Sequence, residues 1–226
     1  FPSFSTGEFA NYALHNKIVG GKITPRFWSE EFPKEYRHDY FLLTAGHLYK
    51  KMDIRKRMGL ENALVLGDSG GYQIATGAIK WDKSVRHQIF EWLEENSDLA
   101  MNIDIPPFGN FSGKFDEALD ISFDNFKYFQ EHQTGKTKFL NIIQGINMHQ
   151  KKTWYDKVKG FDFKGWAMGG CRTSYKLCAS LAILIDGKEH LKTNNEFLHV
   201  LGISKVSDFF YLEQMQKSLL EVGSKI

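Results

Sequence analysis

The stretch Ala63-Leu64-Val65-Leu66-Gly67-Asp68-Ser69-Gly70-Gly71-Tyr72-Gln73 joins a short aliphatic run to a carboxylate and a glycine-rich turn. A run of this length and composition is typical of a strand that is buried on both faces of a parallel sheet. A polar residue directly after such a strand stands at its carboxyl end, where parallel α/β folds place their sites. The stretch therefore predicts a parallel sheet with Asp68 at its functional edge.

The same pattern of a short apolar run followed by glycine, proline or a polar residue recurs along the chain. Predicted strands lie at 40–44, 63–67, 99–103, 139–143, 166–168 and 197–201, with 2–6 as a weaker candidate for a first strand. Amphipathic patterns predict helices over 82–95, 115–130, 174–185 and 206–222. Sustained alternation of strands and helices predicts an α/β fold with parallel strands.

We expect this fold to be a (β/α)8 TIM barrel in a single domain over 1–226, which ends before its eighth strand. An open doubly wound sheet is the alternative. The barrel is favoured because polar residues follow nearly every predicted strand, as expected when all the carboxyl ends surround one site.

Composition sets few limits on function. The chain has 226 residues, of which 42% are hydrophobic, and this is enough for one large core. A formal net charge of +2 permits a nucleic-acid partner without arguing for one. The only local basic cluster is interpreted as a solvated helix face; it comprises Lys50, Lys51, Arg55, Lys56 and Arg57.

The two cysteines, Cys171 and Cys178, are too few for a zinc cluster or a disulfide framework. They fit a reduced cytoplasmic compartment, which is the expected location. No apolar run reaches the roughly 18 residues needed to cross a bilayer, so no membrane partner is expected.

One alternative makes Ser69 the reactive residue. Gly67–Gly71 matches the Gly-Asp-Ser-Gly-Gly around the nucleophile of chymotrypsin-like serine proteases, and 18–21 and 43–47 resemble their activated N-terminus and histidine segment. However, His47 and Ser69 are 22 positions apart, whereas the histidine and serine of those proteases are roughly 140 apart. Ile18 is also internal to the chain, so this interpretation is disfavoured.

The residues that follow the predicted strands form a chemically coherent set; they are Asp68, Asp104, Gln144, Gly169, Gly170 and Gly202. In a barrel these positions converge on one pocket, together with Tyr72. Carboxylates can accept from the N1–H and amine of a guanine-like base, an amide or glycine N–H can donate to O6, and an aromatic ring can stack on it. Each residue alone also has a structural role to fill, because strand-end aspartates cap helices and glycine pairs form turns.

Taken in order, these segments resemble the tRNA-guanine transglycosylase family, which exchanges guanine for a 7-deazaguanine base. The resemblance covers about 40–226, and its motifs lie at 67–73, 102–104, 141–145, 166–170 and 199–204. It implies that Asp68 is the general acid/base and that Asp104 reads the N1/N2 edge of the purine. It also implies contacts of the base with the remaining pocket residues: O6 with Gln144 and the Gly170 backbone, the two faces with Tyr72 and Leu201, and the pocket lining with Gln73 and Gly169.

The chain also departs from the family. Pro106 stands where a cysteine is common, Cys171 where leucine is usual, and 44–47 where the family has Asn-Thr-Tyr-His. The family's nucleophilic aspartate, which forms a covalent glycosyl-enzyme, and its zinc cluster would both lie beyond Ile226. We therefore expect a pentosyltransferase chain with no cofactor or metal of its own and no nucleophile, since Asp208 is accounted for by helix N-terminal charge.

These departures look more like the DNA-acting branch, the deoxypurine-in-DNA protein A group of phages and bacterial modification clusters, than like the tRNA-acting members. The expected partners are nucleic acid, with DNA favoured over tRNA, and a 7-deazaguanine base. A homodimer of the full-length protein is one arrangement that the resemblance allows. The non-enzyme alternative is a catalytically inactive subunit of the same fold that binds a base or nucleic acid.

Overall fold

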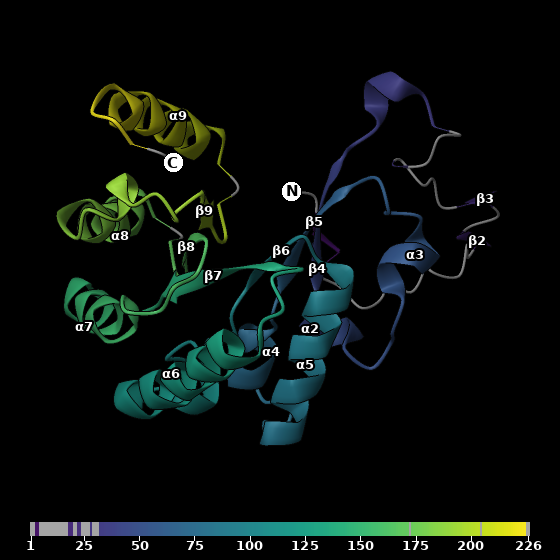
Figure 1. Cartoon of the computed structure of the whole chain (residues 1–226), viewed down its shortest axis with the longest axis horizontal. Coiled ribbons are helices and arrows are strands. Elements are labelled where there is room, and N and C mark those ends of the chain that lie inside the picture. Colours follow the sequence, from purple (N-terminus) through teal and green to yellow (C-terminus); the bar gives the residue numbers. More distant parts are fainter. Residues whose placement is uncertain are drawn as a thin grey trace. The chain divides into compact units, whose positions relative to one another are not determined.

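The computed structural model describes residues 3–4, 18–19, 22–23, 28, 32–171, 173–203 and 205–224 (Figure 1). It shows a mixed α/β protein with two compact units, which we describe one at a time. Unit 1 consists of Phe1–Ile74, Ala78–Met101 and Gln133–Lys138, and unit 2 consists of Ala75–Gly77, Asn102–His132 and Phe139–Ile226. The single domain over 1–226 stays a prediction.

Unit 1 contains a parallel sheet. Its strands pair in the order β1 (Ser3–Phe4), β4 (Tyr40–Thr44), β5 (Leu64–Asp68) and β6 (Leu99–Met101). The register sets Thr44 opposite Asp68 at the carboxyl ends of β4 and β5. A separate antiparallel pair, β2 (Ile18–Val19) with β3 (Lys22–Ile23), takes up two of the residues that resemble a protease N-terminus.

The helices of unit 1 are α2 (Ala45–Leu48), α3 (Ile54–Met58), α4 (Gly71–Ala75) and α5 (Lys83–Asn96), with a 3-10 turn η1 (Lys34–Tyr36). α5 begins where the Asp82 carboxylate accepts the Val85 N–H at 2.8 Å. The helix packs closely on β5 at Gly67, where a Cβ would lie 2.3 Å from Ser97 Oγ and 2.6 Å from Leu93 Cδ2. Glycine at 67 is therefore required by the packing of α5.

Arg55, on α3, ties together the beginnings of two strands. Its Nη1 lies 2.8 Å from Asp98 Oδ1, and its Nη2 donates to Ala63 O at 2.8 Å. Asp98 in turn accepts the Val65 N–H at 2.8 Å through Oδ2. The interpretation of the basic cluster as a solvated helix face is wrong for Arg55. Its planar guanidinium donates both to the Asp98 carboxylate and to a backbone carbonyl, so it has a structural role.

The parallel strands of unit 2 are β7 (Lys138–Ile143), β8 (Gly165–Met168) and β9 (Phe197–Val200), and they pair in that order. Its helices are α6 (Phe115–His132), α7 (Met148–Val158), α8 (Ser174–Asp186) and α9 (Val206–Glu221), with 3-10 turns η2 (Gly109–Phe111) and η3 (Glu189–Leu191). Each strand is thus followed by a helix, which is the arrangement of parallel α/β folds.

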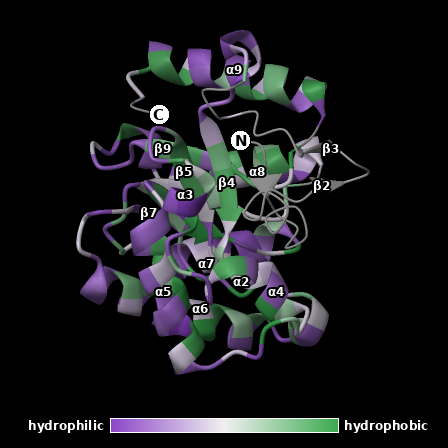
Figure 2. Ribbon diagram, turned by 90° about the vertical axis from the view of Figure 1, so that its right-hand side faces the viewer, coloured by the Kyte–Doolittle hydropathy of each residue, from purple (hydrophilic) through white to green (hydrophobic). Residues whose placement is uncertain are grey.

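The core of unit 2 is strongly aromatic. Rings from α6, β7 and the 161–163 turn contact one another with centroids 4.9–6.4 Å apart, and they belong to Phe123, Phe126, Phe129, Phe139, Phe161 and Phe163. By contrast α9 carries hydrophobic and hydrophilic residues along its whole length (Figure 2), and Phe209 and Phe210 on it are exposed. Burial energy is therefore concentrated around β7 and β8 rather than at β9.

A buried carboxylate in unit 2, that of Glu189, is surrounded by hydrogen-bond donors. It accepts hydrogen bonds from the hydroxyl of Tyr155 at 2.7 Å, Trp166 Nε1 at 3.1 Å, Asn195 Nδ2 at 2.8 Å and Lys192 Nζ at 2.8 Å. Burial disfavours the charge on Glu189, but these four donors outweigh it and hold its pKa below the usual value. The carboxylate is fully hydrogen-bonded, so its burial has a structural cause.

The α/β class and the parallel strands are confirmed. The predicted strand at 40–44 has the observed bounds, and the other predicted strands and helices agree with the structure within two residues at each end, β1 lying inside the candidate 2–6. The sequence did not predict α7, whose exposed face is polar and which buries only Lys151, Trp154, Tyr155 and Val158. Among the described residues no helix is both long and apolar enough to cross a membrane.

Candidate functional site

Asp68 is the last residue of β5 and is half-buried. Its Oδ1 accepts the Gly70 N–H at 3.0 Å, and its Oδ2 accepts the Thr44 hydroxyl at 3.2 Å. Burial raises the pKa of Asp68, while these two hydrogen bonds and the nearby His47 oppose the rise without cancelling it. A raised pKa makes a carboxyl group hold its proton more readily than a solvated one, which suits the role of a general acid/base.

The turn after Asp68 is shaped by a contact between two glycine backbones. Gly70 has φ +85°, and a Cβ there would lie 2.5 Å from Gly46 Cα. A Cβ on Gly46 would lie 2.9 Å from Gly70 Cα and 2.8 Å from Gln73 Oε1. This close approach brings α2 against the turn and leaves His47 Nε2 at 3.1 Å from Gln73 Nε2. Thr44 and His47 flank Asp68. The sequence had considered His47 only within the disfavoured protease interpretation and had assigned no role to Thr44.

Ser69 and Tyr72 have opposite exposures. Ser69 is fully buried, so it cannot attack a substrate in solution, and this argues against the protease interpretation. Tyr72, on α4, is 55% exposed, and aromatic rings exposed to this degree can stack on nucleic-acid bases. Unit 1 therefore contains three of the predicted site residues, Asp68, Tyr72 and Gln73, within six consecutive positions.

Unit 2 brings together three more of the predicted residues. Gln144 Nε2 donates to Asp104 Oδ2 at 2.6 Å, and both side chains are buried. The Gln144 amide lies directly against Gly169, where a Cβ would be 2.2 Å from Nε2. The Gln144 side chain can therefore occupy this position only because residue 169 is a glycine. Asp104, Gln144 and Gly169 form one cluster, as the strand-end pattern predicted.

Gly170 and Leu201 lie beside this cluster. Gly170 is exposed and has φ +68°, a conformation that favours glycine. Within the described part of the chain its N–H donates to no acceptor. Leu201 is half-buried, and its N–H donates to Met168 O at 3.1 Å, which fixes it next to the end of β8. That the two sets of residues, one in each unit, serve one pocket stays a prediction.

Lys151 is a further polar residue at this cluster, and sequence reasoning missed it. It is only 1% exposed, and its Nζ donates to Gly169 O at 2.8 Å. Lysine is almost never fully buried unless it is paired, so nothing in the polar stretch 149–153 indicated its position. Gly145, next to Gln144, was the only available signal, because a Cβ there would lie 2.8 Å from the Lys151 backbone N.

The sequence had considered the cysteines as metal ligands and Asp208 as a nucleophile, and the geometry supports neither role. Cys171 is buried, Cys178 is exposed, and both are free thiols. Among the residues that the structure describes, no three His, Cys, Asp or Glu side chains are arranged to hold a metal ion. Asp208 lies in the first turn of α9 and accepts the Ser174 hydroxyl at 3.2 Å, which agrees with its interpretation as helix N-terminal charge.

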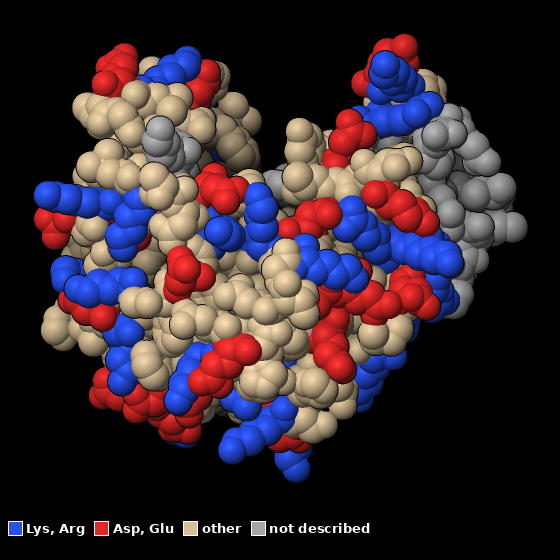
Figure 3. Space-filling view, viewed as in Figure 1, with Lys and Arg blue, Asp and Glu red and all other residues tan. Residues whose placement is uncertain are grey.

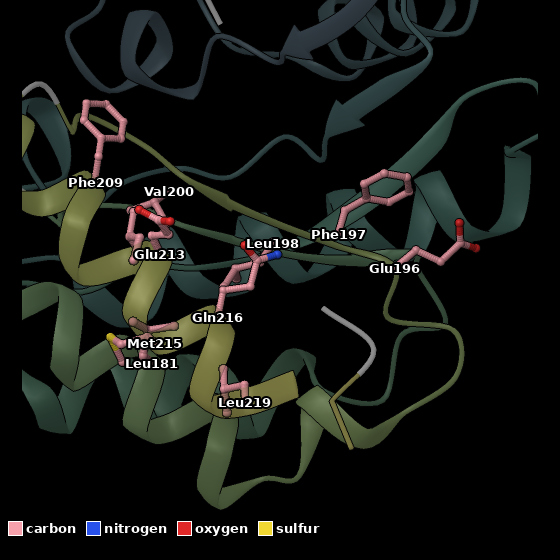
Figure 4. Close-up of a pocket in the computed structure, with 11 residues that line it drawn as sticks. Leu181, Glu196, Phe197, Leu198, Val200, Phe209, Glu213, Met215, Gln216 and Leu219 are labelled. Carbon is pink, nitrogen blue, oxygen red and sulfur yellow. The ribbon is translucent and has the colours of Figure 1, made fainter. Parts of the chain in front are cut away.

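A groove of about 550 Å3 lies between β9 and α9 and is lined mainly by apolar side chains (Figure 4). None of the predicted site residues lines it. On the face of the protein seen in Figure 3, basic and acidic side chains are interspersed rather than separated by sign. This surface therefore adds no argument for a nucleic-acid partner beyond the site residues themselves.

No protein-family model matches the chain, and no curated protein sequence matches it at a significant level.

Proposed function

We propose that the protein is a base-exchange transglycosylase, a pentosyltransferase that replaces guanine in nucleic acid with a 7-deazaguanine through a glycosyl-enzyme intermediate. The complete (β/α)8 barrel is part of this proposal. The observation that supports it most is the 2.6 Å hydrogen bond from Gln144 to Asp104 beside the Gly169-Gly170 turn. The bond fixes which groups of this cluster accept and which donate.

The cluster is complementary to the edge of guanine. Asp104 offers carboxylate lone pairs to N1–H and the exocyclic amine, since each of its oxygens can accept more than one hydrogen bond. The second Nε2–H of Gln144 and the Gly170 N–H can both donate to O6. Adenine presents an acceptor at N1 and a donor at C6, so it would leave Asp104 and Gln144 facing the wrong partners.

Asp68 supplies the second requirement of base exchange. A purine that leaves C1′ must take up a proton, and the incoming base must lose one. A carboxyl group whose pKa is raised by burial is suited to both transfers. Exchange also needs a nucleophile at C1′, and we assign that role to none of the described residues. The second candidate is a subunit of the same fold that binds a base or nucleic acid without exchanging the base.

Binding by isothermal titration calorimetry tests the recognition step. We expect guanine and 7-deazaguanine to bind alike, because they share N1–H, the 2-amine and O6, and adenine to bind about 100-fold more weakly. Asp104→Asn should remove this preference. Asp124→Asn, an exposed aspartate on α6 of the same unit, is the matched control and should retain it. Equal affinity for guanine and adenine in the wild-type protein would exclude the proposed recognition.

The reaction itself is tested with the intact protein and labelled 7-deazaguanine, offered with duplex DNA or with tRNA. Incorporation into DNA is the expected result, because the departures at Pro106 and 44–47 look more like the DNA-acting branch. Incorporation into tRNA alone would contradict the DNA preference. Binding without incorporation into either would support the inactive base-binding subunit.

A further inference from the structure

Lys151 is a buried cationic side chain with no role in the proposed recognition and exchange steps. It is the fourth residue of α7, its side chain is 1% exposed, and no described carboxylate pairs with it. Burial lowers its pKa, with a smaller lowering from Lys176 and an opposing effect of Cys171. Within the described part of the chain, Lys151 Nζ makes one hydrogen bond, to Gly169 O at 2.8 Å. A buried ammonium that is not paired with a carboxylate is costly, so this contact needs a physical explanation.

Local structure brings Lys151 to this carbonyl. The Asn147 side chain accepts the Gln150 N–H at 2.9 Å and so begins α7 three residues after Gln144. Gly145, with φ +144° and no space for a Cβ beside the Lys151 backbone N, lets the first turn of α7 approach the end of β7. The Lys151 side chain then reaches from α7 to the end of β8.

The accepting carbonyl belongs to the peptide that joins Gly169 to Gly170. In a planar trans peptide the C=O and the N–H point in opposite directions. The Lys151 ammonium therefore lies on one side of this peptide, and the Gly170 N–H is directed to the other, where Gly170 is exposed. Cys171 Sγ makes a second, weaker contact with the same carbonyl at 3.5 Å. A cation on the carbonyl polarises the peptide and strengthens its N–H as a donor.

We propose that Lys151 is a positioning residue that acts through the Gly169–Gly170 peptide, orienting and strengthening the Gly170 N–H as a donor to the O6 of the bound purine. This inference rests on the proposed function for the identity of the acceptor. The polarised peptide itself does not depend on it. Lys151 touches neither the base nor the sugar in this arrangement, and its effect is carried entirely by one amide group.

The first test compares two ligands that differ only at position 6. Guanine has O6, whereas 6-thioguanine has a sulfur that accepts hydrogen bonds poorly and keeps N1–H and the 2-amine. Lys151→Met preserves the buried stem and removes the charge; we expect it to weaken guanine binding about tenfold, as for the loss of a charge-assisted hydrogen bond, and 6-thioguanine binding less than about threefold. Lys152→Met, the exposed neighbour on α7, is the control and should change neither. Equal losses for both ligands, or no loss for guanine, would overturn the inference.

The second test needs no ligand. In a 15N–1H correlation spectrum, the Gly170 amide proton should move upfield in Lys151→Met relative to Lys152→Met, because the amide is less polarised. An unchanged Gly170 shift would contradict the inference even if guanine binds. If wild-type protein binds no guanine, the proposed function fails while this spectrum still decides the role of Lys151. Lys151→Gln, which can keep the hydrogen bond without the charge, serves if the methionine variant does not fold, and a smaller shift in the same direction is expected.

Discussion

The protein holds two strand-end aspartates in contrasting surroundings. Asp68, in unit 1, is bonded to a hydroxyl and a backbone N–H, and burial raises its pKa. Asp104, in unit 2, is bonded to the amide of Gln144, which can neither take up nor give a proton at ordinary pH. Asp68 is the last residue of β5, whereas Asp104 lies three residues beyond the end of β6. The difference teaches that two aspartates near strand ends can have different hydrogen-bonding surroundings, and in our proposal these suit proton transfer in one unit and fixed hydrogen bonding in the other.

The largest expected effect tests the proton-transfer half of this comparison. Asp68→Asn keeps the shape of the side chain but removes its ability to exchange a proton, so base exchange by the intact protein should fall about 10³-fold. Guanine affinity should change less than about threefold. Steady-state exchange and calorimetry measure the two quantities separately. Ser69→Ala, at the adjacent buried position, should keep most of the activity, and comparable losses in both variants would argue against a special role for Asp68.

The next effect concerns the glycine contact that shapes the Asp68 turn. Gly70→Ala would place a Cβ 2.5 Å from Gly46 Cα at a positive φ, so we expect the free energy of unfolding to fall by about 3 kcal/mol. Gly59→Ala is the matched control, because Gly59 has a similar φ of +70° with nothing within 4 Å of its Cβ. It should cost about 1 kcal/mol. Chemical denaturation measures both, and equal costs would mean that backbone strain, not the contact, dominates.

The hydrogen-bonding half is tested at Gly169. Gly169→Ala would displace the Gln144 amide, because its Cβ would lie 2.2 Å from Nε2. We expect guanine binding to weaken about 20-fold with a loss of stability of about 1–2 kcal/mol. Gly160→Ala, also in unit 2 and with open space around its Cβ, should change binding by less than about twofold. Calorimetry on both variants shows whether the cluster depends on the approach of Gln144 to Gly169.

The smallest effects are those on the pH dependence of stability. The pKa of Asp68 in the folded protein is raised, so its ionisation destabilises the folded state once the pH exceeds the unfolded value near 4. Asp68→Asn should therefore be more stable than wild type at pH 7, and this gain should disappear below about pH 4. Denaturant titrations at several pH values measure the difference.

Glu189 should show the opposite sign. Its folded pKa is lowered, so its stabilising contribution is present above the unfolded value and is lost as the pH falls through the folded value. Glu189→Gln should therefore be less stable than wild type at pH 7, with the deficit shrinking under acid conditions. A deficit that is independent of pH would show that Glu189 acts through packing and neutral hydrogen bonds alone.

Much of this arrangement could be predicted from the sequence, because strand-end residues are recognisable by their position. Asp68, Asp104, Gln144 and Gly169 were identified by their places after apolar runs, and the last three do form a cluster. Asp68 is one residue further into its strand than predicted, since it pairs with Thr44 across β4 and β5. The local sequence pattern carries no information about the register between these two strands.

Some features could not be predicted, because they depend on contacts between segments distant in sequence. The sequence around Lys151 is typical of a surface lysine, but the residue is buried because Gly145 allows α7 to pack closely against the end of β7. Arg55 likewise looks like part of a solvated basic face until Asp98 and the Ala63 carbonyl meet its guanidinium. In both cases the residue is a cation, as the sequence shows, but its burial and its partners are set by segments distant in sequence.

The contact between Gly46 and Gly70 has an evolutionary consequence. Since a methyl group at either position would collide with the backbone of the other, the two positions cannot drift independently, and no single substitution leads away from the pair without loss. Homologous chains that keep the Asp68 turn should therefore keep both glycines together, and chains that lose one should have rebuilt the approach of α2. Joint inheritance of two small residues, 24 positions apart, is then a more searchable signature of this protein than any of its charged side chains.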